Sequence, residues 1–231
     1  PGNTLCGPYT PFGLVRLGPD CLPPHPTNGY QSDRPLQGFT HTHVSGTGGE
    51  GRFGNLRVVP YLGAPSDLPE GFERSEEIAA VGFYGVCLSP GNIRVELTST
   101  PRCGICRFYF PEGSEANILI DAGAVHQFHP LRTATCLNAE ILWISKSEFE
   151  GHGTFRGGWG HDYPYKIFFS GSLNTTPDRI LVGNADALFE HDYTVGEKAM
   201  TVAHFRRTQS VEVRIGVSFV SIPKARDSRN K

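Results

Sequence analysis

The sequence lacks long hydrophobic runs, long amphipathic helical patterns and clusters of basic residues. No apolar run approaches the roughly 18 residues that a membrane-spanning helix needs, so we expect no membrane span. Lysine and arginine number 21 against 23 aspartates and glutamates, which gives a net charge of −2. A protein that binds a phosphate backbone needs clustered basic residues, so this balance argues against a nucleic-acid partner.

Glycine and proline, in contrast, are abundant. The chain has 28 glycines and 18 prolines in 231 residues, which a helical bundle could not tolerate. Hydrophobic residues make up 38% of the chain and aromatic residues 11%, enough to form a packed core and too much for a disordered chain. Short apolar or alternating runs bounded by turn residues predict strands. The expected strands cover residues 12–17, 56–61, 83–88, 93–98, 105–110, 118–121, 136–144, 165–171, 200–205 and 211–221.

This set of strands, with no long helices between them, predicts an all-β fold with little helix, a large antiparallel β-sandwich of the supersandwich type. Residues 72–81 have weak helical character, enough for one or two turns. Six cysteines are too few for a disulfide scaffold in a chain of this length. We interpret Cys103 and Cys106 as ordinary strand residues, because the sequence has no second C-x-x-C and no H-x-x-x-H to complete a zinc site.

Two zones, residues 18–54 and 151–164, are rich in glycine and polar residues and do not resemble strands. Long polar loops on a β scaffold often carry binding groups. In the first zone, His41 and His43 are two residues apart, so both imidazoles would project from one face of an extended backbone. Such a pair fits metal chelation as in a cupin-like barrel, hydrogen bonding to sugar hydroxyls, or a purely structural role.

Several sequence blocks resemble a known family when they are taken in order. They are PFGLVRLGPD at residues 11–20, Gly29-Tyr30, and GFTHTHVSG at residues 38–46. These blocks are similar to the N-terminal domain of glycoside hydrolase family 92, the calcium-dependent exo-α-mannosidases. Further similar blocks lie at residues 97–110, 158–165 and 214–221, so that the resemblance runs from residue 1 to residue 231.

The resemblance implies a two-domain enzyme of which this chain is one part. Residues 1–222 would form the N-terminal β-sandwich, and residues 223–231 would begin a connector to a helical (α/α)₆ barrel, in cis or in trans. An inverting hydrolase needs one carboxylic acid and one carboxylate base. The family takes both from the barrel, together with most Ca²⁺ ligands, so we expect no catalytic residue here and no activity from this chain alone. The implied substrate is a mannose-containing glycan, and the implied location is extracellular or periplasmic.

Five residues are candidates for substrate binding on this interpretation. Asp20 and Asp33 are suited to binding sugar hydroxyls or to contacting a metal through water, and equally to capping turns. Trp159, in a glycine-rich stretch, is suited to stacking on a pyranose ring or to packing at an interface. His41 and His43 complete the set, and no metal ligand is assigned.

Linkage specificity does not follow from the resemblance. Many family members carry a Trp-Asp-Trp-type segment before the Gly-Tyr block, whereas residues 21–28 of this chain contain no tryptophan. Two other functions stay open from the sequence. One is a stand-alone, lectin-like carbohydrate-binding module, and the other is a cupin-like protein that binds a metal through His41 and His43.

Overall fold

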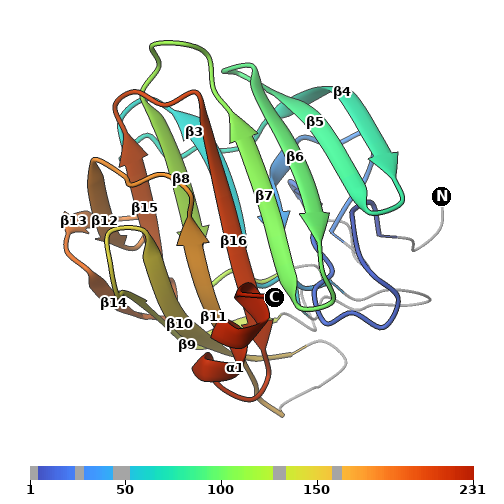
Figure 1. Ribbon diagram of the computed structural model, residues 1–231, viewed down its shortest axis with the longest axis vertical. Helices are drawn as coiled ribbons and strands as arrows, with labels where there is room; N and C mark the ends of the chain where they lie inside the picture. The colour runs from blue at the N-terminus through green and yellow to red at the C-terminus, as the bar shows by residue number, and fades with distance from the viewer. Residues whose placement is uncertain (1–4, 24–28, 44–52, 127–133, 158–162) are drawn as a thin grey trace.

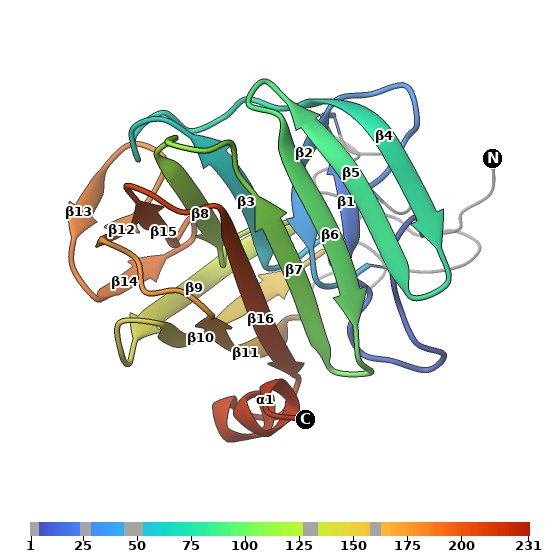
Figure 2. The ribbon, with the colours of Figure 1, turned by 45° about the horizontal axis from the view of Figure 1, so that its top comes forward.

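The computed structural model describes residues 5–23, 29–43, 53–126, 134–157 and 163–231, which form two antiparallel sheets packed face to face (Figures 1 and 2). This confirms the predicted β-sandwich. The seven-stranded sheet runs β1 (Gly18–Cys21), β2 (Leu36–Thr40), β3 (Arg57–Leu62), β8 (Ala116–Asp121), β15 (Met200–Phe205), β12 (Arg179–Gly183) and β13 (Leu188–Glu190). The nine-stranded sheet runs β14 (Tyr193–Gly196), β9 (Thr135–Trp143), β10 (Glu148–Arg156), β11 (Tyr165–Leu173), β16 (Ser210–Ser218), β7 (Cys103–Tyr109), β6 (Ile93–Ser99), β5 (Phe83–Ser89) and β4 (Glu73–Ala80).

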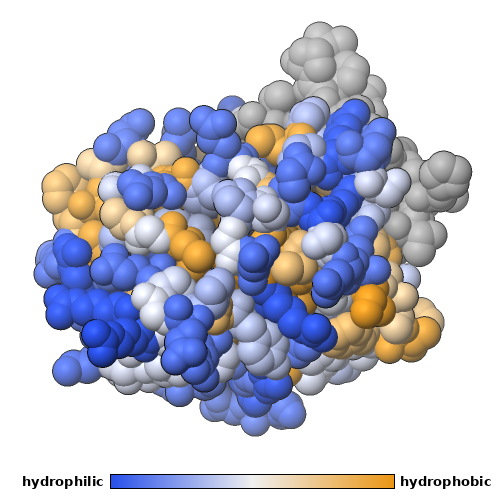
Figure 3. Space-filling model, turned by 90° about the horizontal axis from the view of Figure 1, so that it is seen from above, coloured by the Kyte–Doolittle hydropathy of each residue, from blue (hydrophilic) through white to orange (hydrophobic). Residues whose placement is uncertain are grey.

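The core lies between the two sheets, and the strand sequences show why. In β6, Ile93, Val95 and Leu97 are buried while Arg94 is exposed, the alternation of a sheet with one wet face. Phe39 of β2 packs against Tyr84 of β5 with ring centroids 6.4 Å apart, which joins the seven-stranded sheet to the nine-stranded one. Figure 3 shows that hydrophilic residues dominate the outer face seen from above, with apolar residues in small groups.

Two predictions of local structure were wrong. Residues 72–81, expected to contain a helical turn, form the edge strand β4, which pairs with β5 through an irregular register between Ser75 and Ile78. Gly82, at φ +75°, makes the turn between these two strands, so the glutamates of β4 lie along an exposed edge and not on a helix. Residues 12–17 form no strand and make only an isolated bridge at Arg16, because Phe12 adopts φ +59°.

The two polar zones contain more regular structure than expected. Strands β1 and β2 lie within residues 18–54, and two thirds of β10 lies within residues 151–164. Glycines weakened the strand signal, yet Gly151 and Gly153 of β10 are needed because a Cβ there would meet Glu140 O at 1.9 Å or the Phe155 ring at 2.3 Å. The other nine expected strands are confirmed to within a few residues, while β12, β13 and β14 were not predicted.

The last described element is the helix α1 (Ile222–Arg229), which lies across the end of β16 (Figure 2). Ser221 caps it by accepting a hydrogen bond from the Lys224 amide, and Pro223 occupies its first turn. Gly216 of β16 lets the helix approach closely, since a Cβ there would lie 2.2 Å from Ala225 O. Residues 223–231 therefore pack on the sandwich, and their assignment to an interdomain connector stays a prediction.

The cysteines are free in the described structure. Cys103 and Cys106 are buried residues of β7, and burial raises the pKa of the Cys103 thiol to about 11. Their interpretation as ordinary strand cysteines is confirmed. None of the helices among the described residues is long and apolar enough to cross a membrane.

Candidate functional site

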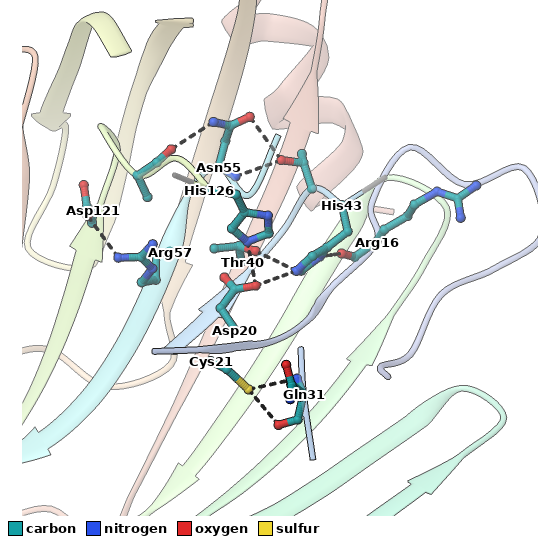
Figure 4. Close-up of polar contacts among 12 residues, drawn as sticks. Arg16, Asp20, Cys21, Gln31, Thr40, His43, Asn55, Arg57, Asp121 and His126 are labelled. Atoms are coloured by element: carbon teal, nitrogen blue, oxygen red, sulfur yellow. Dashed lines mark hydrogen bonds and ion pairs between the residues drawn. The ribbon is translucent and has the colours of Figure 1, made fainter. Parts of the chain in front are cut away.

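Three polar side chains converge at one end of the seven-stranded sheet, and all three are buried (Figure 4). Asp20 comes from β1, His43 follows β2, and His126 follows β8. Oδ1 of Asp20 lies 2.8 Å from Nε2 of His43 and 2.7 Å from Nε2 of His126. We call these three residues the Asp–His–His cluster.

Backbone pairing beyond the strand ends brings these segments together. The Gly54 amide donates to Thr42 O at 2.7 Å, and the His126 amide donates to Phe53 O at 3.2 Å. Asn55 then links two of the segments, because its Nδ2 donates to Ala124 O at 2.9 Å while its backbone amide donates to Thr42 Oγ1 at 3.0 Å. One end of the seven-stranded sheet thus brings together residues that lie far apart in the sequence.

Two glycines make the close packing of the cluster possible. Gly29 has φ +80°, and a Cβ at this position would lie 2.3 Å from Oδ1 of Asp20. Gly54 has φ +70°, and its Cβ would lie 2.2 Å from the ring of His126. Both positions require a residue that tolerates positive φ and carries no side chain.

Hydrogen bonds orient the His43 ring. Nδ1 of His43 lies 2.6 Å from the carbonyl oxygen of Arg16, which can only accept, so Nδ1 carries a proton. Nε2 of the same ring faces both Asp20 and the Thr40 hydroxyl, 3.0 Å away. His43 therefore presents its Nε2 toward the carboxylate from a fixed direction.

The electrostatics of the cluster keep Asp20 ionised. Burial by itself raises the pKa of this carboxyl, but the neighbouring His126 and His43 outweigh burial and hold the pKa well below its usual range. For His126, burial is the largest influence and lowers its pKa, against the opposing attraction of Asp20. The result is a buried negative charge at the centre of two imidazoles.

His41 does not join this cluster. Its Nδ1 lies 3.0 Å from Leu56 O, its ring packs against Gly104 of β7, and Nε2 has no hydrogen-bond partner among the described residues. Burial lowers the pKa of His41 to about 4. The two imidazoles of the His-x-His pair contact different groups, and of the two only His43 lies against Asp20. The backbone at His41–His43 has left the strand, which removes the simple alternation of faces.

The remaining predicted residues lie elsewhere. Asp33 is exposed and is not part of the Asp–His–His cluster. Trp159 lies outside the described residues. Substrate binding by the five residues stays a prediction.

His126 and Asn55 were missed from the sequence. His126 lies five residues after the largely apolar strand β8, and a polar residue just past such a strand end was the only available signal. Next to the cluster, Phe53 contacts Tyr165 with ring centroids 5.1 Å apart and Phe219 at 6.3 Å. Phe219 and Val220 are exposed there, so the site borders an apolar surface.

The fold and the site together define a large two-sheet β-sandwich domain with a buried polar centre at one sheet end. The chain belongs to the family described as the glycosyl hydrolase family 92 N-terminal domain, whose family model matches residues 1–218. The expected family is thereby confirmed.

Alignments with individual relatives include almost the whole of this chain. An uncharacterized secreted glycosidase of Arthroderma benhamiae is 27% identical in an alignment 262 residues long, which covers 97% of this chain and 32% of that protein. The family GH92 α-mannosidase BT3965 from Bacteroides thetaiotaomicron has a similar structure, with a TM-score of 0.86, 24% identity, and coverage of 99% of this chain and 32% of that one. The inverting mannosidase BT2199 of the same organism gives a TM-score of 0.76 at 17% identity, covering 99% and 30%. The chain thus spans about a third of the length of these relatives.

Proposed function

We propose that this chain is the N-terminal domain of an inverting exo-α-mannosidase that acts on glycans, and that it shapes the substrate pocket of a catalytic (α/α)₆ barrel. The observation that carries the proposal is the family match over residues 1–218 combined with coverage of only a third of mannosidases of similar fold. The secreted relative supports an extracellular or periplasmic location.

The carboxylates of the described residues support a non-catalytic role. An inverting glycosidase needs two carboxyl groups about 6.5–9.5 Å apart across the substrate, one protonated and one free to activate water. Within the described ranges, the buried carboxylates are already held: Asp20 by two histidines, Glu150 by Arg226, and Glu212 by Arg107. The acid and base are therefore assigned to the barrel.

The five candidate residues then divide into two groups. Asp20, His41 and His43 are buried. In this proposal they do not contact the sugar but hold in place the backbone that borders it. Asp33, which is exposed, and Trp159 are the candidates for direct contact with the glycan. The apolar surface around Phe219 supports docking of the barrel beside the site.

The calcium ion that the family implies does not fit the donor groups found here. Calcium prefers six to eight oxygen ligands. In the described part of the chain, the group of metal-type side chains within reach of one ion is the Asp–His–His cluster, which offers two nitrogens and one carboxylate. We therefore assign the calcium ligands to the barrel.

The test compares the 231-residue chain alone with the same chain joined to a C-terminal barrel. We expect no release of mannose from an aryl α-mannoside by the isolated chain, and release with inverted configuration, followed by proton NMR, when the barrel is present. An isolated chain that cleaves the mannoside would contradict the proposal. Mannose binding by the isolated chain at millimolar or tighter affinity, measured by calorimetry, would favour the lectin-like alternative.

An Asp33→Ala variant of the two-domain protein tests direct substrate contact. Loss of a hydrogen bond from a charged group to a sugar hydroxyl costs about 1.5–3 kcal/mol, so kcat/KM should fall roughly 10- to 150-fold. Asp186→Ala, at another exposed position, is the matched control and should leave kcat/KM unchanged. Equal values for the two variants would remove Asp33 from the pocket.

A further inference from the structure

We propose that Asp20, His43 and His126 form a binding site for a divalent transition-metal ion, and that Zn²⁺ is the ion best suited to it. Two imidazole nitrogens and one carboxylate oxygen are ligands typical of zinc and of other first-row ions. One donor atom from each residue lies within 4.8 Å of the others, and all three residues are buried. The proposal concerns the sandwich itself and does not depend on the mannosidase function.

The orientation of His43 is that of a metal ligand. The Arg16 carbonyl fixes the proton on Nδ1, so a neutral ring carries its lone pair on Nε2. Histidines that bind metals through Nε2 usually donate Nδ1–H to a carbonyl or carboxylate in this way. Nε2 lies 2.8 Å from Oδ1 of Asp20, and at this distance either a proton or a bound cation lies between the two atoms.

Asp20 supplies an independent indication. Its second oxygen, Oδ2, is buried and has no hydrogen-bond partner among the described residues. Buried carboxylate oxygens are normally paired, because leaving one unpaired is costly. An ion that both oxygens of Asp20 chelate would satisfy Oδ2.

The cluster is compact enough to accept an ion with a small adjustment. A tetrahedral zinc ion with bonds near 2.0 Å holds its donor atoms about 3.3 Å apart. Oδ1 of Asp20 lies 2.8 and 2.7 Å from the two Nε2 atoms, so the ion would widen these contacts by about half an ångström. The bound ion would then cross-link β1, the end of β2 and the segment after β8.

The experiment uses the full 231-residue chain, stripped with a chelator and dialysed. Zn²⁺ is titrated by calorimetry, and Co²⁺ is titrated by its visible absorption. We expect one equivalent of each ion to bind, and the thermal midpoint to rise by roughly 5–10 °C at a free Zn²⁺ concentration about one hundred times Kd. Asp20→Asn should weaken Zn²⁺ binding at least tenfold.

His191→Ala is the matched control. His191 and Asp192 form an exposed imidazole–carboxylate pair 3.0 Å apart, the kind of surface pair that takes up zinc loosely. The variant should keep the full equivalent of bound ion. If His191→Ala abolishes binding while Asp20→Asn retains it, the proposal is overturned.

A second measurement keeps the test decisive if Asp20→Asn does not fold. X-ray absorption at the zinc edge of the wild-type chain should report two imidazole nitrogens bound to the ion. The competing structure is a buried imidazolium–carboxylate pair, in which a proton takes the place of the metal. That structure predicts no retained ion, no Co²⁺ spectrum and no rise of the midpoint with Zn²⁺, and this outcome overturns the proposal.

Discussion

At the scale of single residues, the site depends on side chains that are absent as much as on those present. Asp20 and His126 approach each other only because Gly29 and Gly54 carry no Cβ. Both glycines have positive φ, which adds a backbone requirement to the steric one. Replacement of either glycine is therefore expected to affect the cluster more than an ordinary turn substitution would.

Gly54→Ala should be strongly destabilising. The left-handed backbone costs about 1–2 kcal/mol, and overlap with the His126 ring adds about 1–3 kcal/mol. Gly82→Ala is the matched control, because Gly82 has φ +75° but nothing within 4 Å of its Cβ. Urea unfolding measures both, and similar losses for the two variants would show that the His126 ring does not constrain position 54.

At the scale of elements, α1 is held on the sandwich by polar side-chain contacts more than by an apolar face. Arg226 donates two hydrogen bonds to Glu150 of β10, each 2.7 Å long, and Arg229 donates to Gly171 O of β11 at 2.9 Å. The sequence of the helix is strongly polar, which explains why it was expected to be a connector. Its place on the sheet depends on partners that lie 58 and 76 residues away.

Glu150→Gln should loosen α1 and change the pH dependence of stability. The Arg226 hydrogen bonds lower the pKa of Glu150, more than its burial raises it. A carboxyl whose pKa is depressed on folding stabilises the fold above its unfolded pKa of about 4.3, and this contribution is lost as the pH falls below that value. We expect a loss of only about 1 kcal/mol at pH 7, because Arg226 is half exposed and solvent screens the pair, and a smaller loss near pH 3.

Urea unfolding at both pH values measures this effect, and amide exchange within residues 222–229 reports the loosening directly. Asp227→Asn removes an exposed ion pair with Lys224 and should change stability by no more than a few tenths of a kcal/mol. A pH-independent loss in Glu150→Gln would contradict the linkage.

At the scale of the whole molecule, aromatic side chains join the two sheets into one unit. Phe39 contacts Tyr84 and Phe108 across the interface, each with centroids 6.4 Å apart, and all three are fully buried. The same seven-stranded sheet carries the Asp–His–His cluster at its end. Loosening the core at Phe39 is therefore expected to destabilise the whole sandwich.

Phe39→Ala should lower the free energy of unfolding by about 3–5 kcal/mol. Urea titrations followed by far-UV circular dichroism and by tryptophan fluorescence should shift together as one transition. Phe189→Ala, on the exposed strand β13, should change stability by less than about 0.5 kcal/mol. Separate transitions for the two probes in wild type would show that the sheets unfold independently.

The sequence by itself determined the β-sandwich and the family. Alternating runs such as that of β6 carry their own strand signal, and the blocks at residues 11–20 and 38–46 are specific without any coordinates. Only the tertiary structure decided that β4 is a strand and that a polar tail is a packed helix. The tertiary structure alone also placed His43, and not His41, beside Asp20. It brought His126, which is 106 residues from Asp20 in the sequence, into the same cluster. Local patterns report how a side chain alternates along its own strand, whereas a site assembled at a sheet end depends on which distant segments the sheet pairs.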